Sequence, residues 1–301
     1  MTTKTVNSPF VSSEVRRFLE SGPKKLLIGG RWVPSQSGKT FETIDPATGE
    51  PLATVYEADA ADVDAAVQAA RRALDGPWGS ISPAERARLL WRLSDLIEEH
   101  AEELSQLESL DTGKPLTETS MVDIPFTVDH FRYFAGWTTK LTGETLPVSF
   151  PGSYLAYTRR EPVGVVGAIV PWNFPLMIAS WKLAPALACG NTVVLKPSEI
   201  TPLTALRLGE LIQEAEIPPG VVNIVPGYGH RAGAALTRHP EVDKITFTGS
   251  TEVGREIVRA SSENFKRVTL ELGGKSPNIV FPDADMDAVA GGIMMSIFFN
   301  Q

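Results

Sequence analysis

Between residues 162 and 272 the chain repeatedly alternates strand-like and helical segments. The runs VGVVGAIV, TVVLK, VVNIV and KITFTG are short and rich in β-branched residues. Helical spacing follows them at residues 176–188, 202–215, 230–237 and 252–260. Neighbouring parallel strands can be joined only by a crossover, and crossovers are almost always right-handed. We therefore expect an α/β fold, a Rossmann-like doubly wound parallel sheet.

The preceding part of the chain has a different pattern. Short strands separated by Gly and Pro turns are expected over residues 25–58, and alternating apolar residues around a Pro-Gly turn indicate an exposed hairpin at 141–160. Helices are expected over 62–75, from 83 with a buried face up to Ile97, again through Leu104–Leu110, and over 118–140 with a bend at Pro125. The one from 83 begins at an N-cap Ser82, with Glu85 completing a capping box. The polar residues 1–25 are expected to form a flexible arm, with a short helix near 11–19.

Charge and composition exclude several functions. The chain of 301 residues has 28 basic and 36 acidic side chains, a net charge of −8 that disfavours nucleic acid as a partner. No apolar run reaches the roughly 18 residues that a membrane span needs, and the first 20 residues lack the apolar core of a secretory signal, which favours a cytoplasmic location. Thirteen acidic and six basic residues lie between Asp59 and Glu118, which we interpret as a solvated face of helices.

The single cysteine, Cys189, cannot form an intrachain disulfide or a site of several thiolates, which fits a reducing compartment. Its setting in LALACGNTVV predicts a structural residue at an apolar helix end. The four histidines have no metal-ligand spacing, and neither a His-Glu-x-x-His nor a Gly-x-Ser-x-Gly motif occurs. We expect no metal site.

Ligands of such sheets bind outside the carboxyl ends of the strands, so the residues after each strand are the candidates for chemistry. The turn TGSTEVG places Gly249, Ser250 and Gly254 at a helix N-terminus, where free amides would bind a pyrophosphate. A glycine turn without any ligand is the alternative. A P-loop is excluded because Arg255 stands where Lys followed by Ser or Thr is required.

Three further side chains follow other strands. Lys196 and Glu199 of KPSE could both bind a ribose diol, and the carboxylate would repel a 2′-phosphate, which favours NAD over NADP; a surface ion pair is equally compatible. Asn173 in PWNFP is a fixed neutral donor suited to a developing oxyanion. Glu271 in LELGGK is a candidate general base, whose pKa an apolar setting would raise.

The motifs VPWNFP, KPSE, FTGSTEVG and LELGGKSPNIV, in this order and spacing, closely resemble the NAD(P)-dependent aldehyde dehydrogenase superfamily. The resemblance runs from about Leu27 to Gln301 and is nearest to the hydrolytic branch that includes broad-specificity, betaine-aldehyde and phenylacetaldehyde enzymes. It implies NAD as cofactor, an aldehyde as substrate and a homodimeric or homotetrameric parent. The implied reaction oxidises the aldehyde to a carboxylic acid through a cysteine thiohemiacetal and a thioester.

The resemblance also implies roles for individual residues. Asn173 matches the oxyanion-hole amide and Glu271 the base that activates the deacylating water. Lys196 and Glu199 match the adenosine-ribose contacts, and Gly249, Ser250 and Gly254 match the pyrophosphate turn. Further cofactor contacts are implied at Ile169, Pro171, Trp172 and Pro197. The family's substrate tunnel matches Phe174, Ile178 and Trp181, for which packing on a helix face is an equal alternative.

The family's cysteine nucleophile follows a Phe-Asn-Gln stretch, and here Phe299-Asn300-Gln301 is the end of the given sequence. We therefore expect an N-terminal fragment of such an enzyme that is itself inactive. Its expected divisions are an arm (1–25), an NAD-binding domain (26–140 and 161–270), an oligomerisation hairpin (141–160) and the beginning of a catalytic domain (271–301). The apolar helix expected at 287–299 should cause aggregation of the isolated chain.

Two other interpretations stay open. A truncated pseudoenzyme could act as an NAD-binding or assembly module, which reading the gene beyond codon 301 would decide. An acylating relative could pass the thioester to another acceptor, although Glu271 argues against it because only hydrolysis needs a base for water.

Overall fold

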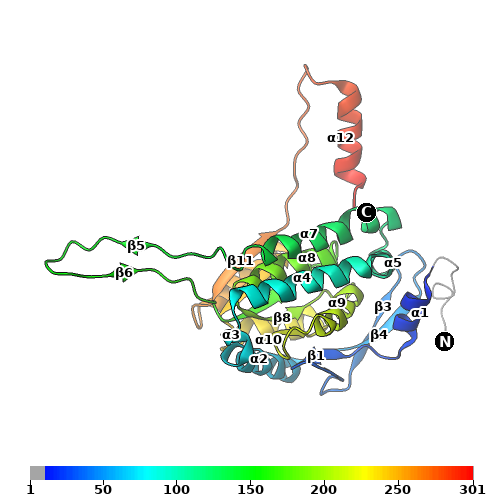
Figure 1. The fold of residues 1–301 in the computed structure, drawn as a ribbon. Helices are drawn as coiled ribbons and strands as arrows, with labels where there is room; N and C mark the ends of the chain where they lie inside the picture. Colours follow the sequence, from blue (N-terminus) through cyan, green and yellow to red (C-terminus); the bar gives the residue numbers. More distant parts are fainter. Residues whose placement is uncertain (1–10, 301) are drawn as a thin grey trace.

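A seven-stranded sheet forms the centre of the computed structural model, which describes residues 11–300 (Figure 1). The strand order is β11-β10-β7-β8-β9-β1-β2. The first five are mutually parallel, β1 is antiparallel to β9, and β2 is antiparallel to β1. The strand bounds are β1 Leu26–Ile28, β2 Arg31–Val33, β7 Val165–Ile169, β8 Thr192–Lys196, β9 Val222–Ile224, β10 Lys244–Gly249 and β11 Arg267–Leu272.

The chain winds outward from β7 in both directions, which confirms the doubly wound prediction. β7, β8 and β9 follow one another across the sheet, and the next two strands, β10 and β11, lie on the other side of β7. The order of strands therefore reverses between β7 and β10, and that point is where sheets of this class bind ligands. The connecting helices are α8 (Pro175–Ala188), α9 (Leu203–Glu214), α10 (Ala234–Arg238, preceded by a π-helical turn Gly229–Gly233) and α11 (Thr251–Ser261).

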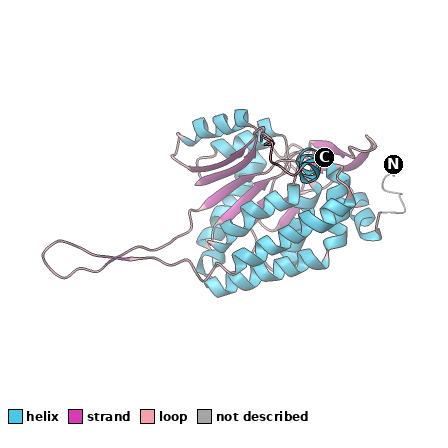
Figure 2. Cartoon of the chain, turned by 90° about the horizontal axis from the view of Figure 1, so that it is seen from above, coloured by secondary structure: helices cyan, strands magenta, loops and turns pink. Residues whose placement is uncertain are grey.

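Helices cover both faces of the sheet (Figure 2). One face is packed by α8 and α9, with α4, α5 and α7 outside them. The other face is packed by α2, α10 and α11. Successive side chains of a strand pack against opposite helical layers. In β7, Val166 and Ala168 pack on the α8 side, whereas Val165 and Ile169 pack on the α2 side.

The helices predicted between residues 60 and 140 all form, but the last one ends at Ala135, before Gly136, rather than at 140. α4 begins at the predicted capping box, in which Ser82 Oγ accepts from the Glu85 amide and the Glu85 carboxylate accepts from the Ser82 amide. α5 ends at Gly113, whose φ of 80° is the left-handed conformation that favours glycine. The helix bounds are α2 Ala60–Asp75, α3 Pro77–Ser80, α4 Pro83–Glu99, α5 Ala101–Thr112, α6 Leu116–Glu118 and α7 Ile124–Ala135, with a π-helical segment Thr119–Asp123 before α7.

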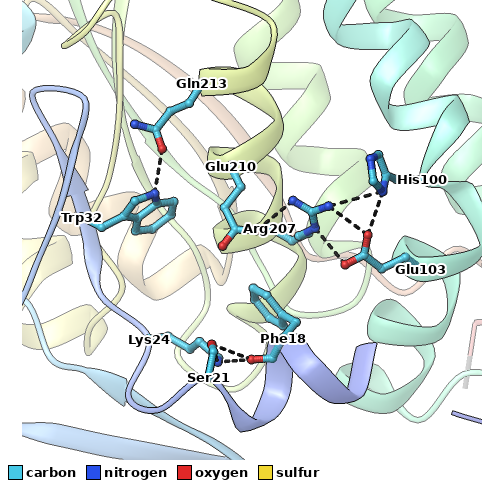
Figure 3. Close-up of polar contacts among 9 residues, drawn as sticks. All are labelled: Phe18, Ser21, Lys24, Trp32, His100, Glu103, Arg207, Glu210 and Gln213. Atoms are coloured by element: carbon cyan, nitrogen blue, oxygen red, sulfur yellow. Dashed lines mark hydrogen bonds and ion pairs between the residues drawn. The ribbon is translucent and has the colours of Figure 1, made fainter. Parts of the chain in front are cut away.

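The prediction of a flexible arm is wrong for residues 11–25, whereas residues 1–10 lie outside the described residues. A short helix, α1 (Ser13–Glu20), forms where it was expected, but it buries Val15, Phe18 and Leu19 against the core. The Ser12 amide donates to Gln106 Oε1 of α5 at 2.8 Å. The buried ammonium of Lys24 donates to the Phe18 carbonyl at the end of α1 (Figure 3). Apolar burial and these hydrogen bonds hold the segment in place.

An ion-pair network joins α9 to α5 beside this segment. The Arg207 guanidinium donates to both carboxylate oxygens of Glu103, at 2.8 and 3.0 Å, and to Glu210 at 2.8 Å (Figure 3). Trp32 of β2 donates to Gln213 of α9 at 2.7 Å. These contacts fix the antiparallel edge of the sheet to the helices that cover it.

Two segments extend from the body (Figure 1). The hairpin pairs only two residues per strand, β5 (Thr145–Leu146) with β6 (Ala156–Tyr157), and exposes Phe150 and Leu155. α12 (Met286–Phe298) has no buried residue among its thirteen.

A further two-stranded sheet pairs β3 (Thr40–Ile44) with β4 (Pro51–Tyr56). Among residues 11–300, no helix has both the length and the apolar character that a bilayer crossing requires.

Candidate functional site

A cleft of about 1200 Å³ opens at the carboxyl edge of the sheet, where the strand order reverses between β7 and β10. It collects the segments that follow β7, β8, β10 and β11, together with α10 and α11. Ten of the predicted site residues line it: Ile169, Pro171, Trp172, Asn173, Trp181, Lys196, Glu199, Gly249, Ser250 and Glu271.

The turn between β10 and α11 combines the features of an anion site. Ser250 is the N-cap of α11, and its Oγ accepts from the Val253 amide at 3.2 Å, leaving the other first-turn amides without an intrahelical acceptor. A Cβ on Gly249 would lie 2.5 Å from the Phe247 ring, so no side chain fits there. The Oγ1 of Thr248, which lines the cleft, is buried and has no hydrogen-bond partner among the described residues. A polar ligand in the cleft would supply the missing hydrogen-bond partner of Thr248 Oγ1. This turn therefore fits a bound nucleotide.

Lys196 and Glu199 form an ion pair in the wall of the cleft, with Nζ 2.6 Å from Oε2. The lysine side chain is buried, and the glutamate side chain is 31% exposed. Burial lowers the pKa of Lys196, against the opposing charge of Glu199. Burial would raise the pKa of Glu199, but the charge and hydrogen bond of Lys196 outweigh it and the net shift is downward. Each group thus favours the charged form of the other, and both line the cleft where a diol could bind.

Asn173 lies in the turn between β7 and α8, half-buried at the cleft wall. None of the hydrogen bonds found within residues 11–300 uses its side-chain amide, which leaves that donor available to a ligand. Neighbouring Trp172 is 47% exposed at the same wall. The turn follows the last residue of β7, Ile169, which pairs in register with Phe247 of β10. The sheet thus places Asn173 beside the turn that holds Gly249 and Ser250.

Glu271 comes from β11, where it pairs in register with Thr248. The expected apolar setting is not formed by the described residues, because β11 is an edge strand and Glu271 is exposed. Glu271 interacts electrostatically with the buried amine of Lys182 on α8, which also lines the cleft. Burial lowers the pKa of Lys182, and the negative charge of Glu271 opposes that shift. Sequence reasoning missed Lys182, although a single charge within the apolar helix PLMIASWKLAPALA was an available signal.

Four predicted residues lie outside the cleft lining. Ile178 is 4% exposed in the core and Phe174 packs against the same core, an arrangement that fits the alternative of helix-face packing; their tunnel role stays a prediction. Pro197 is buried between Lys196 and Glu199 in the sequence. Gly254 is buried where a Cβ would lie 2.8 Å from the Leu272 side chain, which makes it a helix-to-strand contact.

Cys189 lies at the opposite edge of the sheet. It is the C-cap of α8, just before the amino end of β8, whereas Asn173 precedes the other end of the same helix. A helix of this length, 14 residues, spans about 21 Å. Burial raises the pKa of the Cys189 thiol, against the opposing charge of Arg86. The thiol is therefore not a nucleophile of this cleft, as the sequence predicted.

The interpretation of residues 59–118 as a solvated acidic face is wrong for several carboxylates. Asp62, Glu103, Glu108 and Asp111 are all buried. Burial raises the pKa of Glu108 to about 8 and that of Asp111 to about 7. The sequence missed Glu108 and Asp111 because they accept from the backbone amides of Leu176 at the start of α8 and Leu203 at the start of α9, which no local pattern indicates. No group of three His, Cys, Asp or Glu within residues 11–300 could hold a metal ion.

Comparison with known proteins places these features in context. Residues 32–301 match the family described as the aldehyde dehydrogenase family. The chain is 59% identical to DhaS of Bacillus subtilis over 292 residues, and 53% identical to human retinal dehydrogenase 2 over 286 residues. These alignments cover 97% and 94% of this chain but only 58% and 55% of the relatives.

A solved structure agrees with the same assignment. The NAD+ complex of an aldehyde dehydrogenase from Bacillus cereus superposes with a TM-score of 0.93 at 54% identity. The match covers 96% of this chain and 59% of that protein. The chain thus spans a little over half the length of the proteins it matches.

Proposed function

Because the chain belongs to the aldehyde dehydrogenase family, we propose that it is the NAD-binding part of an enzyme that oxidises an aldehyde to a carboxylic acid. The observation that carries the proposal is the convergence, in one cleft, of the segments that follow β7, β8, β10 and β11. The cleft brings together an amide donor, a cation and carboxylate pair, a free helix N-terminus and a second carboxylate.

Each group has a defined task in this proposal. The α11 N-terminus with Ser250 binds the pyrophosphate, and Lys196 and Glu199 bind the adenosine ribose. The carboxylate of Glu199 disfavours a 2′-phosphate at that ribose, which gives preference to NAD. Asn173 donates a hydrogen bond to the aldehyde oxygen as negative charge develops on it. Glu271 accepts a proton from the water that releases the acid.

The proposed reaction has two stages, formation of a thioester and its hydrolysis. A thiolate forms a C–S bond to the aldehyde carbon, and that carbon then loses a hydride, giving a thioester. When bound, NAD+ supplies the two-electron acceptor for this hydride. Water activated by Glu271 then breaks the C–S bond, which releases the carboxylic acid and restores the thiol. Cys189 does not take the thiolate role, because it lies at the other edge of the sheet, so we propose that the nucleophile comes from outside residues 1–301.

Several broader features belong to the same proposal. The half-exposed Trp181 supports an apolar or aromatic part of the aldehyde, such as an aliphatic or arylacetic group. The exposed apolar side chains of the hairpin support a homodimeric or homotetrameric enzyme. The free thiol of Cys189 supports a reducing, cytoplasmic location. The proposed divisions are residues 26–140 with 161–270 for NAD, 141–160 for assembly and 271–301 for the beginning of a catalytic domain.

Calorimetric titration of the 301-residue polypeptide with NAD+ tests the cofactor site. We expect saturable binding that Lys196→Met weakens at least tenfold, about 1.4 kcal/mol, and that Lys140→Met, an exposed lysine, leaves unchanged. The same polypeptide mixed with NAD+ and an aldehyde should produce no NADH. Equal binding by both variants would contradict the assigned ribose site, and steady NADH production would contradict an external nucleophile.

The acylating alternative is tested in a version of the enzyme that includes the nucleophile. Glu271→Gln should slow acid formation and leave the burst of NADH that accompanies thioester formation. If acid formed at the original rate, the role given to Glu271 would be wrong. A binding or assembly module without catalysis is distinguished by the gene beyond codon 301, since an in-frame cysteine shortly after Gln301 indicates an enzyme.

A further inference from the structure

The turn that carries Asn173 ends at a helix N-terminus without a cap of its own. Phe174 is the N-cap of α8 and makes no side-chain capping hydrogen bond, and Pro175 has no N–H to donate. The first amide of the helix that needs an acceptor is therefore that of Leu176, which is fully buried. A buried amide without an acceptor would cost about 1–3 kcal/mol.

Glu108 of α5 supplies that acceptor from outside the helix. Its Oε1 accepts from the Leu176 amide at 3.3 Å, and its side chain is completely buried. Four groups face this carboxyl: Thr204 of α9, Leu176 of α8, Asp123 of the π-helical segment and Lys114 after α5. Burial dominates them and raises the pKa to about 8. Burial thus favours the neutral carboxyl as the acceptor that caps α8.

Lys114 contacts the same turn from the side away from the cleft. Its ammonium lies 3.7 Å from the centre of the Phe174 ring and 2.6 Å from Asp123 Oδ2. Both charged side chains are buried, at 0% and 1% exposure. A desolvated ammonium over an aromatic face is one of the stronger cation–π arrangements. The contact fixes the ring of the residue next to Asn173.

A buried ion pair of this kind contributes little net stability, because apolar residues of similar volume are often as stable or more so. The direction of its contacts is more informative. Lys114 and Glu108 contact consecutive parts of one segment, the ring at 174 and the amide at 176, and neither residue lines the cleft. Among residues 11–300, no hydrogen bond to the Asn173 side chain sets its position.

We propose that Glu108 and Lys114 are positioning residues that hold residues 171–176 from behind, so that the Asn173 amide stays in one orientation at the cleft. The inference rests on the proposed function, since it gives Asn173 its oxyanion role. It goes beyond that function by assigning the orientation of the donor to two side chains outside the cleft. Displacement of such a group by 1 Å can cost about 100-fold in rate.

Nuclear magnetic resonance of the 15N-labelled 301-residue chain, carrying Ile297→Lys/Phe298→Lys in every sample to limit self-association, tests the proposal. The side-chain amide signals of Asn173 are assigned by their loss in Asn173→Asp, and the Trp172 indole signal serves as a second probe. In Lys114→Met/Asp123→Leu, which removes both buried charges, we expect the Asn173 signals to shift and to split or broaden. Lys114→Arg, which keeps a cation over the ring, should restore the wild-type signals.

Lys24→Met is the matched control. Lys24 is also buried, also lies over a phenylalanine ring, at 4.6 Å from Phe18, and contacts no part of the Asn173 turn. We expect this variant to leave the Asn173 signals unchanged. Unchanged signals in the double variant, or equal changes in Lys24→Met, would overturn the proposal.

The pH dependence gives a second, independent readout. In the wild-type chain the Asn173 signals should move as Glu108 ionises, with a midpoint above neutral pH. In Glu108→Gln, which keeps a neutral acceptor for the Leu176 amide, this movement should be lost while the signals at pH 6.5 stay in place. A midpoint that persists in Glu108→Gln would assign the titration to another group and contradict the role of Glu108.

These readouts separate the positioning from the proposed function. They report where the Asn173 amide lies and need no turnover. If the signals respond as expected but Asn173→Ala does not slow aldehyde oxidation, the catalytic role of Asn173 fails and the positioning stands.

Discussion

The Nζ of Lys196 lies 2.6 Å from Oε2 of Glu199, with the lysine side chain at 3% and the glutamate side chain at 31% exposure. Both residues line the cleft, and the glutamate is the more exposed member of the pair. That asymmetry makes Glu199 the group that meets a ribose first, and it leaves Lys196 dependent on its partner for its charge.

Glu199→Gln should change cofactor preference. Loss of the carboxylate removes the repulsion of a 2′-phosphate, so the NADP+ affinity should rise relative to that of NAD+ by about tenfold, or 1.4 kcal/mol. The NAD+ affinity itself should fall, because burial lowers the pKa of Lys196 further when Glu199 no longer opposes it. Calorimetric titration with both cofactors at pH 7 and 9 measures this. An unchanged ratio would show that the ribose does not bind at Glu199.

Glu108→Gln should alter the pH dependence of stability. The folded pKa of about 8 exceeds the ordinary value of 4.5, so the folded state binds more protons than the unfolded state between these values. The free energy of unfolding must then decrease as pH rises through that window, and the loss should reach a few kcal/mol near pH 8. Glu108→Gln should lack this decrease. The stability of the variant relative to that of the wild type should therefore be greater at pH 8 than at pH 5.

Urea unfolding at pH 5, 6.5 and 8 gives the comparison, with Glu102→Gln, an exposed position on the same helix, as control. The control should follow the wild type. Parallel curves for wild type and Glu108→Gln would mean that the buried carboxyl is not the source of the dependence.

Gly164→Ala should disrupt the start of β7. Gly164 has a φ of 131°, and a Cβ there would lie 1.9 Å from Asp243 Oδ2. That oxygen accepts from the Val165 amide at 2.7 Å and from Arg71 at 2.6 Å, so it has no room to move. A loss of about 2–4 kcal/mol in the free energy of unfolding is expected. Gly273→Ala, where the Cβ would meet nothing within 4 Å, is the control. Similar midpoints for both variants in a thermal melt would contradict the prediction.

The apolar surface of α12 should cause self-association of the 301-residue chain. Met294, Ile297 and Phe298 are 57%, 59% and 71% exposed, and a continuous apolar helix is an unfavourable surface in water. Light scattering should show mass rising with concentration. Ile297→Lys/Phe298→Lys should reduce the effect, whereas Phe265→Lys, a 91% exposed position on another segment, should not. A monomer at all concentrations would count against this surface.

Much of the fold was predictable because it depends on periodicity. The period of two in VGVVGAIV reflects Val165 and Val166 facing different layers, and the cap at Ser82 is a local hydrogen-bond pattern. Strand order was not predictable in the same way. It is set by which faces pack together, and the placement of β1 and β2 at the edge beyond β9 depends on pairings far apart in the sequence.

The same distinction between local pattern and tertiary packing applies to the candidate site. Residues directly after a strand, such as Asn173, Lys196 and Gly249, line the cleft as predicted because the sheet brings strand ends together. Side chains within α8 depend instead on what surrounds each turn of the helix. Ile178 and Lys182 are four residues apart on one face, yet Ile178 packs in the core and Lys182 lines the cleft. The burial of Glu108 and the exposure of Glu271 both follow from tertiary neighbours that the local sequence does not specify.

The pairing of β1 with β9 has a consequence for synthesis on the ribosome. The Gly29 amide and Asn223 Oδ1, 194 positions apart, are joined at 2.8 Å. At about 5–20 residues per second, the first two strands wait roughly 10–40 s before their partner is made. A two-stranded ribbon is marginal in water, so during that interval the nascent chain exposes Leu26 and Leu27, both fully buried once folded. We expect this to be the period in which the growing polypeptide depends most on chaperones.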